Sequence, residues 1–486
     1  MSMKLKLSII ILLLAIVFSA CQNGGGANIE NPAANDSKDE TEIVTEYYLD
    51  ILPADDFGGY TFTVVGYHTS DRVSFPEESE TGEPLNDSLY RRNKMLEERF
   101  NINIVNIPFP DREPTTQAVR KSVMAQDNAY DLIVHSLGYG LNYLSMEGSL
   151  YNLNKIDYLQ LDKDWWCKFL YEDLNVKGNI FYSSGSMMPF FFGTPVVLYF
   201  NKKLADDYDF GDLYKLVFDY EWTADKFAEL IKDKNKDIDG DGVMNKNNDF
   251  FGLASDLMAA SALPAAFGQK MVARDKDTYF KLNFENEMFI NAVNKTRDLI
   301  NDPASTYNGA VKYVQYDENA VFFEDRLIFT IATSACSYTS YRTMESNFGI
   351  LPLPMLTAAQ KQYYSYGTPY GPVGAGVPSY CENPARTGMI TEAMAFLSYE
   401  MVRPVMYDTI LHQKGARDEQ SQRILDIVFS AESFDLNQLH DFGGSCTLLN
   451  AYAFDKKGDL VSGYTAIKDK AEKEIGTLIT AYLELN

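Results

Sequence analysis

Three aspartates lie at alternate positions in a short acidic loop, Asp237, Asp239 and Asp241, and Gly242 follows them. This order is typical of the first half of an EF-hand calcium loop, because the alternation turns the carboxylate oxygens inward and the glycine permits a sharp turn. The next ligand in such loops is a backbone carbonyl, which here belongs to Val243. The pattern predicts bound Ca²⁺, and the competing interpretation is a solvated turn.

The second half of this loop departs from the calcium-binding pattern. Asn248 stands where an EF-hand loop has its bidentate glutamate, so we expect Asp249 to take that role after a shift of one residue. No neighbouring residue suggests a reacting group. We therefore predict a structural ion that fixes the chain where it leaves the preceding helix, whose expected N-cap is Thr223.

The chain lacks the short motifs of the common catalytic classes. It contains no HExxH, no GxSxG nucleophile elbow, no Walker A loop and no GxGxxG after a predicted strand. Its four histidines form no HxH or HxxxH pair. We therefore expect a protein that is not an enzyme. A secreted carbohydrate-active hydrolase stays open as an alternative, because two carboxylates across a cleft would suffice and the chain has 68 acidic residues.

Charge and length limit the architecture and the partners. The 486 residues include 43 Lys and Arg against 68 Asp and Glu, which gives a formal net charge of −25. Nucleic acid is disfavoured as a partner, because phosphate binding needs a basic face. Self-repulsion favours a monomer, and the length predicts at least two lobes.

The N-terminus has the organisation of a bacterial lipoprotein leader. Two lysines precede an apolar segment (8–17), which is too short to span a bilayer, and residues 18–21 read Phe-Ser-Ala-Cys. We predict a signal peptide over 1–20, a lipid on Cys21 and a flexible tether over 21–47, which anchor the protein at the extracellular face of the cell membrane. An ordinary signal peptide or a signal anchor is the alternative.

Four further cysteines are scattered along the chain without a CxxC pair, which disfavours zinc. Outside the cytosol they allow two disulfides in three pairings, or four buried thiols. They are Cys167, Cys336, Cys381 and Cys446.

The apolar periodicity predicts strands and helices in alternation. Strands are expected over 57–66, 101–107 and 131–135, with helices over 86–99 and 115–125 between them, which makes an α/β lobe of βαβ units. Further strands are expected over 179–183, 194–201 and 326–331, and further helices over 225–232, 287–300, 384–399, 417–430 and 467–485.

Short sequences in this order resemble extracellular solute-binding lipoproteins of bacterial ABC importers, in the maltose-binding-like group. The segments that carry the resemblance are ETGEPLND (80–87), DWW (164–166), YFNK (199–202), NFGILPLP (347–354) and ARDEQS (416–421). The resemblance implies a two-lobe α/β fold of the periplasmic-binding-protein type II, with a hinge and an interlobe cleft. It places 48–190 plus 372–430 in one lobe and 191–371 plus 431–486 in the other, with crossings near 183–193 and 367–378.

The resemblance also implies a function. Such proteins capture an extracellular solute by closing the cleft and deliver it to the transmembrane subunits of an ABC permease. An oligosaccharide is the expected solute and suits the 32 tyrosines, whereas peptides, other polar solutes or a surface binding module stay open.

Candidate ligand-binding residues follow from the rule that ligands of open α/β sheets bind beyond the carboxyl ends of the strands, and from the crossings that the resemblance implies. Aromatic faces there suit the apolar side of a pyranose. The competing interpretation is core packing for the aromatic residues and a structural hydrogen bond for the histidine. The predicted residues are Tyr67, His135, Ser136, Phe191, Ser334, Tyr338, Tyr366 and Tyr370.

Overall fold

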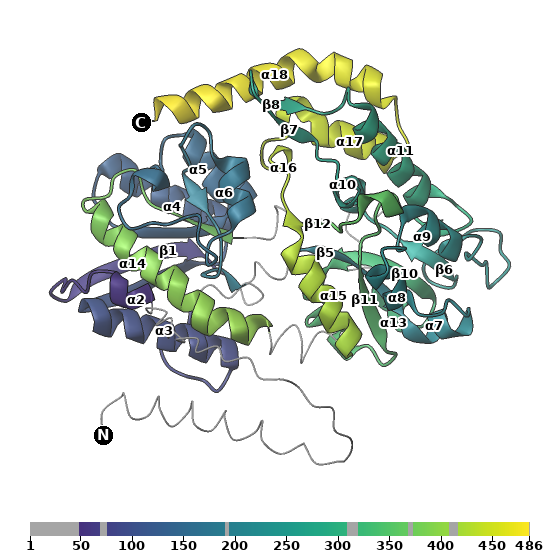
Figure 1. Cartoon of the computed structure of the whole chain (residues 1–486), viewed down its shortest axis with the longest axis horizontal. Coiled ribbons are helices and arrows are strands. Elements are labelled where there is room, and N and C mark those ends of the chain that lie inside the picture. The colour runs from purple at the N-terminus through teal and green to yellow at the C-terminus, as the bar shows by residue number, and fades with distance from the viewer. Residues whose placement is uncertain are drawn as a thin grey trace, which may run out of the picture. The chain divides into compact units, whose positions relative to one another are not determined.

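The computed structural model describes residues 48–68, 75–189, 194–308, 319–367, 373–407 and 417–485. The predicted signal peptide, Cys21 and the tether lie outside these ranges. Two sheets, each flanked by helices, make up the described part (Figure 1). This confirms the predicted α/β class. We call each sheet with the helices packed on it a lobe.

The first sheet begins with the three strands that the sequence predicts. The strand order is β2 (Ile102–Phe109), β1 (Tyr60–Tyr67), β3 (Leu132–Ser136), β13 (Val373–Gly376) and β4 (Tyr182–Ser183). The first three run parallel, and β13 is antiparallel to both β3 and β4. The elements around this sheet are α2 (Tyr48–Ile51), α3 (Pro84–Phe100), α4 (Arg112–Ala125), α5 (Asn142–Met146), α6 (Lys168–Leu174) and α14 (Pro384–Leu397).

The helix α3 begins earlier than predicted. Asn86 or Asp87 was the expected start, but the helix begins at Pro84, which is suited to a first turn because its missing N–H would have no partner there. Asp87 instead accepts hydrogen bonds from the backbone N–H groups of Thr81 and Gly82 at 2.8 and 3.1 Å. Its side chain therefore orders the preceding loop.

The second sheet has a mixed order. It runs β11 (Phe348–Pro352), β5 (Val196–Asn201), β10 (Leu327–Thr333), β6 (Phe251–Ala254) and β9 (Thr306–Tyr307). β10 is antiparallel to β5 and parallel to β6. The helices that follow or cover these strands are α7 (Lys202–Asp207), α8 (Leu213–Phe218), α9 (Ala224–Ile231), α10 (Ala259–Ala266), α11 (Glu287–Asn301), α13 (Asn319–Phe323) and α17 (Ser445–Ala453). The second lobe also contains a hairpin of β7 (Val272–Asp275) and β8 (Tyr279–Leu282). It is completed by the short strand pair β12 (Ser365–Tyr366) and β14 (Glu432–Ser433) and by the helix α16 (Asn437–His440).

The chain leaves the first sheet after β4 and returns to it at β13. Ser184 Oγ donates to the carbonyl of Val373 at 2.8 Å, which ties the outgoing segment to the returning one. At Gly374, in the returning segment, a Cβ would lie 2.5 Å from the carbonyl oxygen of Ser183 and 2.6 Å from the Leu137 side chain. This glycine therefore permits close packing.

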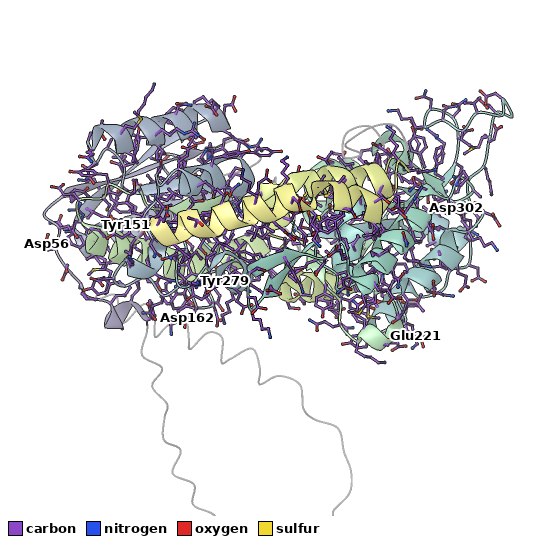
Figure 2. The ribbon with its side chains drawn as sticks, turned by 90° about the horizontal axis from the view of Figure 1, so that it is seen from above. Asp56, Tyr151, Asp162, Glu221, Tyr279 and Asp302 are labelled. Atoms are coloured by element: carbon purple, nitrogen blue, oxygen red, sulfur yellow. The ribbon has the colours of Figure 1, made fainter. Side chains whose placement is uncertain are left out.

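Two helices depart from the predicted lobe boundaries. α15 (Glu419–Ser430), expected in the first lobe, packs on β11 of the second, where Ser421 Oγ accepts the N–H of Ile350 at 3.2 Å. α18 (Leu460–Glu484) contacts both lobes: Tyr464 stacks on Phe284 of the second, and Tyr482 packs edge-on against Phe181 of the first. Figure 2 shows this helix extending from one set of elements to the other.

The four cysteines of the described ranges are thiols, so the disulfide alternative is not realised. Three are buried and Cys381 is partly buried. Among the helices of the described ranges, none combines the length and apolar character needed to cross a membrane.

Candidate ligand-binding site

The structure brings three of the predicted residues together at the carboxyl end of the first sheet. Tyr67 is the last residue of β1, and His135 and Ser136 end the neighbouring strand β3. The ring centroids of Tyr67 and His135 are 6.3 Å apart. The hydroxyl of Ser136 is buried and has no hydrogen-bond partner in the described ranges. This edge is therefore a polar and aromatic cluster.

His135 uses both of its ring nitrogens inside the protein. Nδ1 accepts the backbone N–H of Ser136 at 2.9 Å, which leaves the proton on Nε2 to donate to Thr116 Oγ1 at 2.9 Å. Burial lowers the pKa of His135 to about 4, and the nearby charge of Arg112 acts in the same direction. The imidazole is neutral at pH 7, and its hydrogen bond to Thr116 holds the end of β3 against α4.

Two residues complete this cluster. Arg112, the first residue of α4, places its guanidinium 5.2 Å from the ring centroid of Tyr67 and 4.9 Å from that of Tyr139. Tyr139 lies just beyond β3 and is 41% exposed, so its ring can contact a ligand. Arg112 is not among the predicted residues, because its helix was expected to begin at Thr115. The helix begins earlier, since Asp111 caps it.

The other predicted residues of the described ranges lie at the edge of the second sheet where the chain passes between the lobes. We call this edge, and the matching edge of the first sheet at the ends of β1 and β3, the crossing edge of each sheet. Ser334 directly follows β10, and its N–H donates to the carbonyl of Pro195 at 2.8 Å. Tyr338 lies one turn further and is partly buried. Tyr366 is 2% exposed, and the residue after it forms a bridge with Pro195. These residues share one edge, whereas Phe191 and Tyr370 lie outside the described residues.

The second edge also holds a residue that the sequence analysis missed. Ser255 directly follows β6, is fully buried, and its hydroxyl has no hydrogen-bond partner in the described ranges. β6 itself was not predicted, because Phe251-Gly252 was interpreted as the exit of the acidic loop. Gly252 is required by close packing, since a Cβ there would lie 2.7 Å from the carbonyl oxygen of Ser305.

The tryptophan pair does not serve as a stacking platform. Trp165 Nε1 and Trp166 Nε1 each donate to the carboxylate of Glu392 at 2.8 Å. Tyr48 OH also donates to Glu392, at 3.1 Å. Burial raises the pKa of Glu392, and these donors oppose the rise. Both indoles therefore anchor α14 in the first lobe.

The acidic loop gathers three of the four predicted carboxylates. Oxygens of Asp237, Asp239 and Asp249 lie within 4.8 Å of one another. Asp249 is fully buried and accepts backbone N–H groups on both oxygens, from Ile238 at 2.9 Å and Asn245 at 2.7 Å. Within the described ranges, no Lys or Arg pairs with these three carboxylates. The donor set is all oxygen and fits a hard cation such as Ca²⁺.

The remaining predicted ligands of the loop have other partners. Asp241 Oδ1 accepts the N–H of Val243 at 2.7 Å, and the Val243 carbonyl accepts Asn245 Nδ2 at 3.2 Å. Hydrogen bonds from the N–H groups of Gly242 and Gly240 lower the pKa of Asp237. The structure thus favours a core of three carboxylates at this site.

No family model matches the sequence, and no curated protein matches it either. The fold, in contrast, matches solved structures along most of the chain. A cyclo/maltodextrin-binding protein complexed with maltotetraose matches with a TM-score of 0.55 at 15% identity, over 88% of this chain and 98% of that one. An ABC substrate-binding protein from Listeria monocytogenes in complex with cycloalternan gives 0.53 at 11% identity, over 86% and 99%.

A third match has the same extent. The galacto-N-biose-/lacto-N-biose I-binding protein of an ABC transporter from Bifidobacterium longum, in complex with lacto-N-biose, gives a TM-score of 0.53 at 14% identity, over 88% of this chain and 99% of that one. This chain has the two-lobe fold of ABC sugar-binding proteins. The predicted fold is therefore confirmed, and these neighbours with the sugar-binding-protein fold are binding proteins rather than enzymes.

Proposed function

We propose that this chain is the substrate-binding component of an ABC importer and that it binds an oligosaccharide at the crossing edges of its two sheets. The fold match over most of the chain with proteins solved with oligosaccharides carries the proposal. The bound sugar would pass to the transmembrane subunits of a permease.

The first-sheet cluster supports this ligand class. A pyranose ring offers apolar C–H faces and many hydroxyls. Its site therefore needs an aromatic surface, together with side chains that are neutral or that donate several hydrogen bonds each. Tyr139 supplies an exposed ring, and the guanidinium of Arg112 carries five N–H donors beside it. His135 is neutral, which suits an uncharged ligand.

A carbohydrate hydrolase is the alternative from another class. It requires two carboxylates on either side of the scissile bond. The residues gathered at the first-sheet edge, Tyr67, Arg112, His135, Ser136 and Tyr139, include no acid. We therefore favour a binding protein that returns its ligand unchanged.

Thermal melting of the purified protein with a panel of oligosaccharides and peptides tests the proposal. A ligand at a hundred times its Kd stabilises the folded state by about 2.7 kcal/mol. We expect at least one neutral oligosaccharide to raise the Tm while chromatography recovers it intact. Cleavage of the sugar would contradict the proposal, and so would a Tm that no oligosaccharide raises.

We also propose that Cys21 carries a lipid that holds the protein at the extracellular face of the cell membrane, as a monomer. The leader pattern of residues 1–21 supports this. Detergent phase partitioning of the unaltered chain and of Cys21→Ser tests it. We expect the unaltered chain in the detergent phase and the variant in the aqueous phase, and equal partitioning would contradict lipidation.

We further propose that the acidic loop binds a structural Ca²⁺ ion. The gathering of three carboxylates, one of them fully buried, supports the proposal, because like charges this close repel one another unless a cation lies among them. Asp237, Asp239 and Asp249 would hold the ion. When bound, it would offset most of the negative charge of these three carboxylates.

A further inference from the structure

The short helix α16 (Asn437–His440) is held between elements of both lobes (Figure 1). On one side, Asn142 Nδ2 of α5 donates to the carbonyl of Leu439 at 2.8 Å. On the other, Gln438 Nε2 donates to Ser261 Oγ of α10 at 3.0 Å. α5 and α10 lie just beyond the carboxyl ends of β3 and β6. The helix α16 is therefore adjacent to segments that leave the crossing edge of each sheet.

Two polar atoms at this junction are buried and have no hydrogen-bond partner within the described ranges. They are Asn142 Oδ1 and His440 Nε2. Asn142 is only 3% exposed, and its amide nitrogen is already bonded to Leu439, so its carbonyl oxygen is an acceptor held in a fixed position. Unpaired buried polar atoms are rare in native proteins, because they lose their bonds to water without replacement. An ordered water or a group of a bound ligand is the expected partner.

The environment of His440 keeps it uncharged and fixed. Its ring stacks on that of Phe442, with centroids 5.0 Å apart and planes 9° apart. Burial lowers the pKa of His440 to about 3. The next residue, Asp441, is engaged elsewhere, since its carboxylate accepts the N–H of Cys446 at 2.6 Å and the Thr447 hydroxyl at 3.3 Å. His440 therefore offers a neutral imidazole nitrogen.

We infer that Asn142 and His440 bind a hydroxyl-bearing, uncharged part of the ligand. Sugar hydroxyls donate to Asn142 Oδ1 and bond to His440 Nε2, because a hydroxyl is both donor and acceptor. A carboxylate or phosphate oxygen that is ionised has no proton to give to Asn142 Oδ1. Asn142 Oδ1 thus favours a hydroxyl over an ionised oxygen at this position. This assignment rests on the proposed function.

Two variants and one matched control test the assignment. His440→Phe keeps the stack on Phe442 and removes Nε2, and Asn142→Ala removes the amide. The control Thr391→Val removes another buried hydroxyl without a partner in the described ranges, which lies in α14 away from α16. Calorimetric titration with maltotetraose, lacto-N-biose and cycloalternan gives the affinities. For each sugar that the unaltered protein binds, we expect a loss of at least tenfold in both variants and none in the control.

A structural role predicts a different result. We expect the ligand-free Tm of His440→Phe to equal or exceed that of the unaltered protein, because an unpaired polar atom is replaced by an apolar one. Unchanged affinity in both folded variants would overturn the assignment while the proposed function stands. A lower ligand-free Tm in His440→Phe with unchanged affinity would also overturn it. If the unaltered protein binds none of the three sugars, the proposed function fails and the assignment fails with it.

Discussion

At the scale of single residues, the two lobes contain ionisable side chains that are wholly or partly buried. His135 and His440 are neutral within the fold, although an exposed histidine titrates near pH 6.5. Glu392 is a buried carboxylate whose main donors are two indoles and a phenol. Each of these groups makes stability depend on a specific partner or on pH.

Acidification is expected to destabilise the protein through His135. Its pKa is about 4 in the folded state and about 6.5 when unfolded, so the unfolded state binds the extra proton and stability falls as pH drops through this window. The loss amounts to about 3 kcal/mol. Asp435 has the opposite effect on stability. Burial raises its pKa to about 6, so its contribution to the free energy of unfolding is lost as the pH rises through that value.

Urea unfolding at pH 7 and at pH 4.5 measures the histidine contribution. We expect His135→Gln to reduce the loss of stability between the two pH values, whatever its effect at pH 7. Asp435→Asn serves as the control, and it should steepen the loss. An equal pH dependence in His135→Gln and the unaltered protein would contradict a neutral, buried His135.

Removal of the Glu392 carboxylate should destabilise the first lobe strongly. Glu392→Ala leaves the N–H groups of Trp165 and Trp166 without their acceptor, and each unpaired buried donor costs about 1–3 kcal/mol. We expect a loss of about 2–5 kcal/mol in the free energy of unfolding. Glu400→Ala, on an exposed neighbour, should change it by less than about 0.5 kcal/mol. Equal effects would show that the indoles find other partners.

At the scale of elements, α18 was predicted as a helix, but its contacts with both lobes were not. Its predicted start was residue 467, but the helix begins at Leu460 because Asp459 caps it, with the N–H of Ser462 donating to Asp459 Oδ1 at 2.8 Å. Its last turns reach the first lobe, where Tyr482 OH and Ser145 Oγ are 3.1 Å apart. One helix therefore couples both lobes.

Truncation of the Tyr482 side chain tests this coupling. Tyr482 is 2% exposed and packs against Phe181 with centroids 4.8 Å apart, so Tyr482→Ala should cost about 3–5 kcal/mol. We also expect thermal unfolding to separate into two transitions, one for each lobe. Glu484→Ala, on the exposed side of the same turn, is the matched control. A single unshifted transition in Tyr482→Ala would contradict the coupling.

The acidic loop makes a prediction about metal removal. If Asp237, Asp239 and Asp249 hold Ca²⁺, a chelator should lower the Tm, since an ion bound only to the folded state stabilises it by mass action. Asp249→Asn should abolish this dependence, whereas Asp241→Asn should retain most of it, because Asp241 lies outside the gathered group. A Tm indifferent to chelator would show that the loop is a turn without an ion.

The strands and helices with clear periodicity could be predicted from the sequence. β1, β2 and β3 alternate or form short apolar runs, and their order with α3 and α4 identified the first lobe. The hairpin β7–β8 and α10 could not be predicted in this way. β7 and β8 have four residues each, too few for a period to be recognised, and the alanine-rich α10 is apolar on every side.

The candidate site was predicted only in part. The rule about strand ends correctly grouped Tyr67 with His135 and Ser136, because parallel strands end at the same edge. It could not identify Asn142 or His440, since these residues come from helices and the junction at α16 depends on tertiary packing. A buried acceptor without a partner is recognisable only once its neighbours are known.

At the scale of the whole molecule, two lobes, repeated passages of the chain between them and a polar aromatic edge support one account. The chain shares the fold of ABC sugar-binding proteins, and its candidate site combines an exposed tyrosine, a guanidinium and neutral polar groups. The net charge of −25 accords with a partner other than nucleic acid. The central claim is that the protein binds a neutral oligosaccharide and leaves it intact.

Isothermal titration of the purified protein with maltotetraose, cycloalternan and lacto-N-biose, followed by mass analysis of the recovered sugar, tests this claim most directly. The account predicts saturable binding of at least one of these sugars at one site per chain, with the sugar recovered unchanged. Absence of heat with all three, or recovery of a cleaved product, would contradict it.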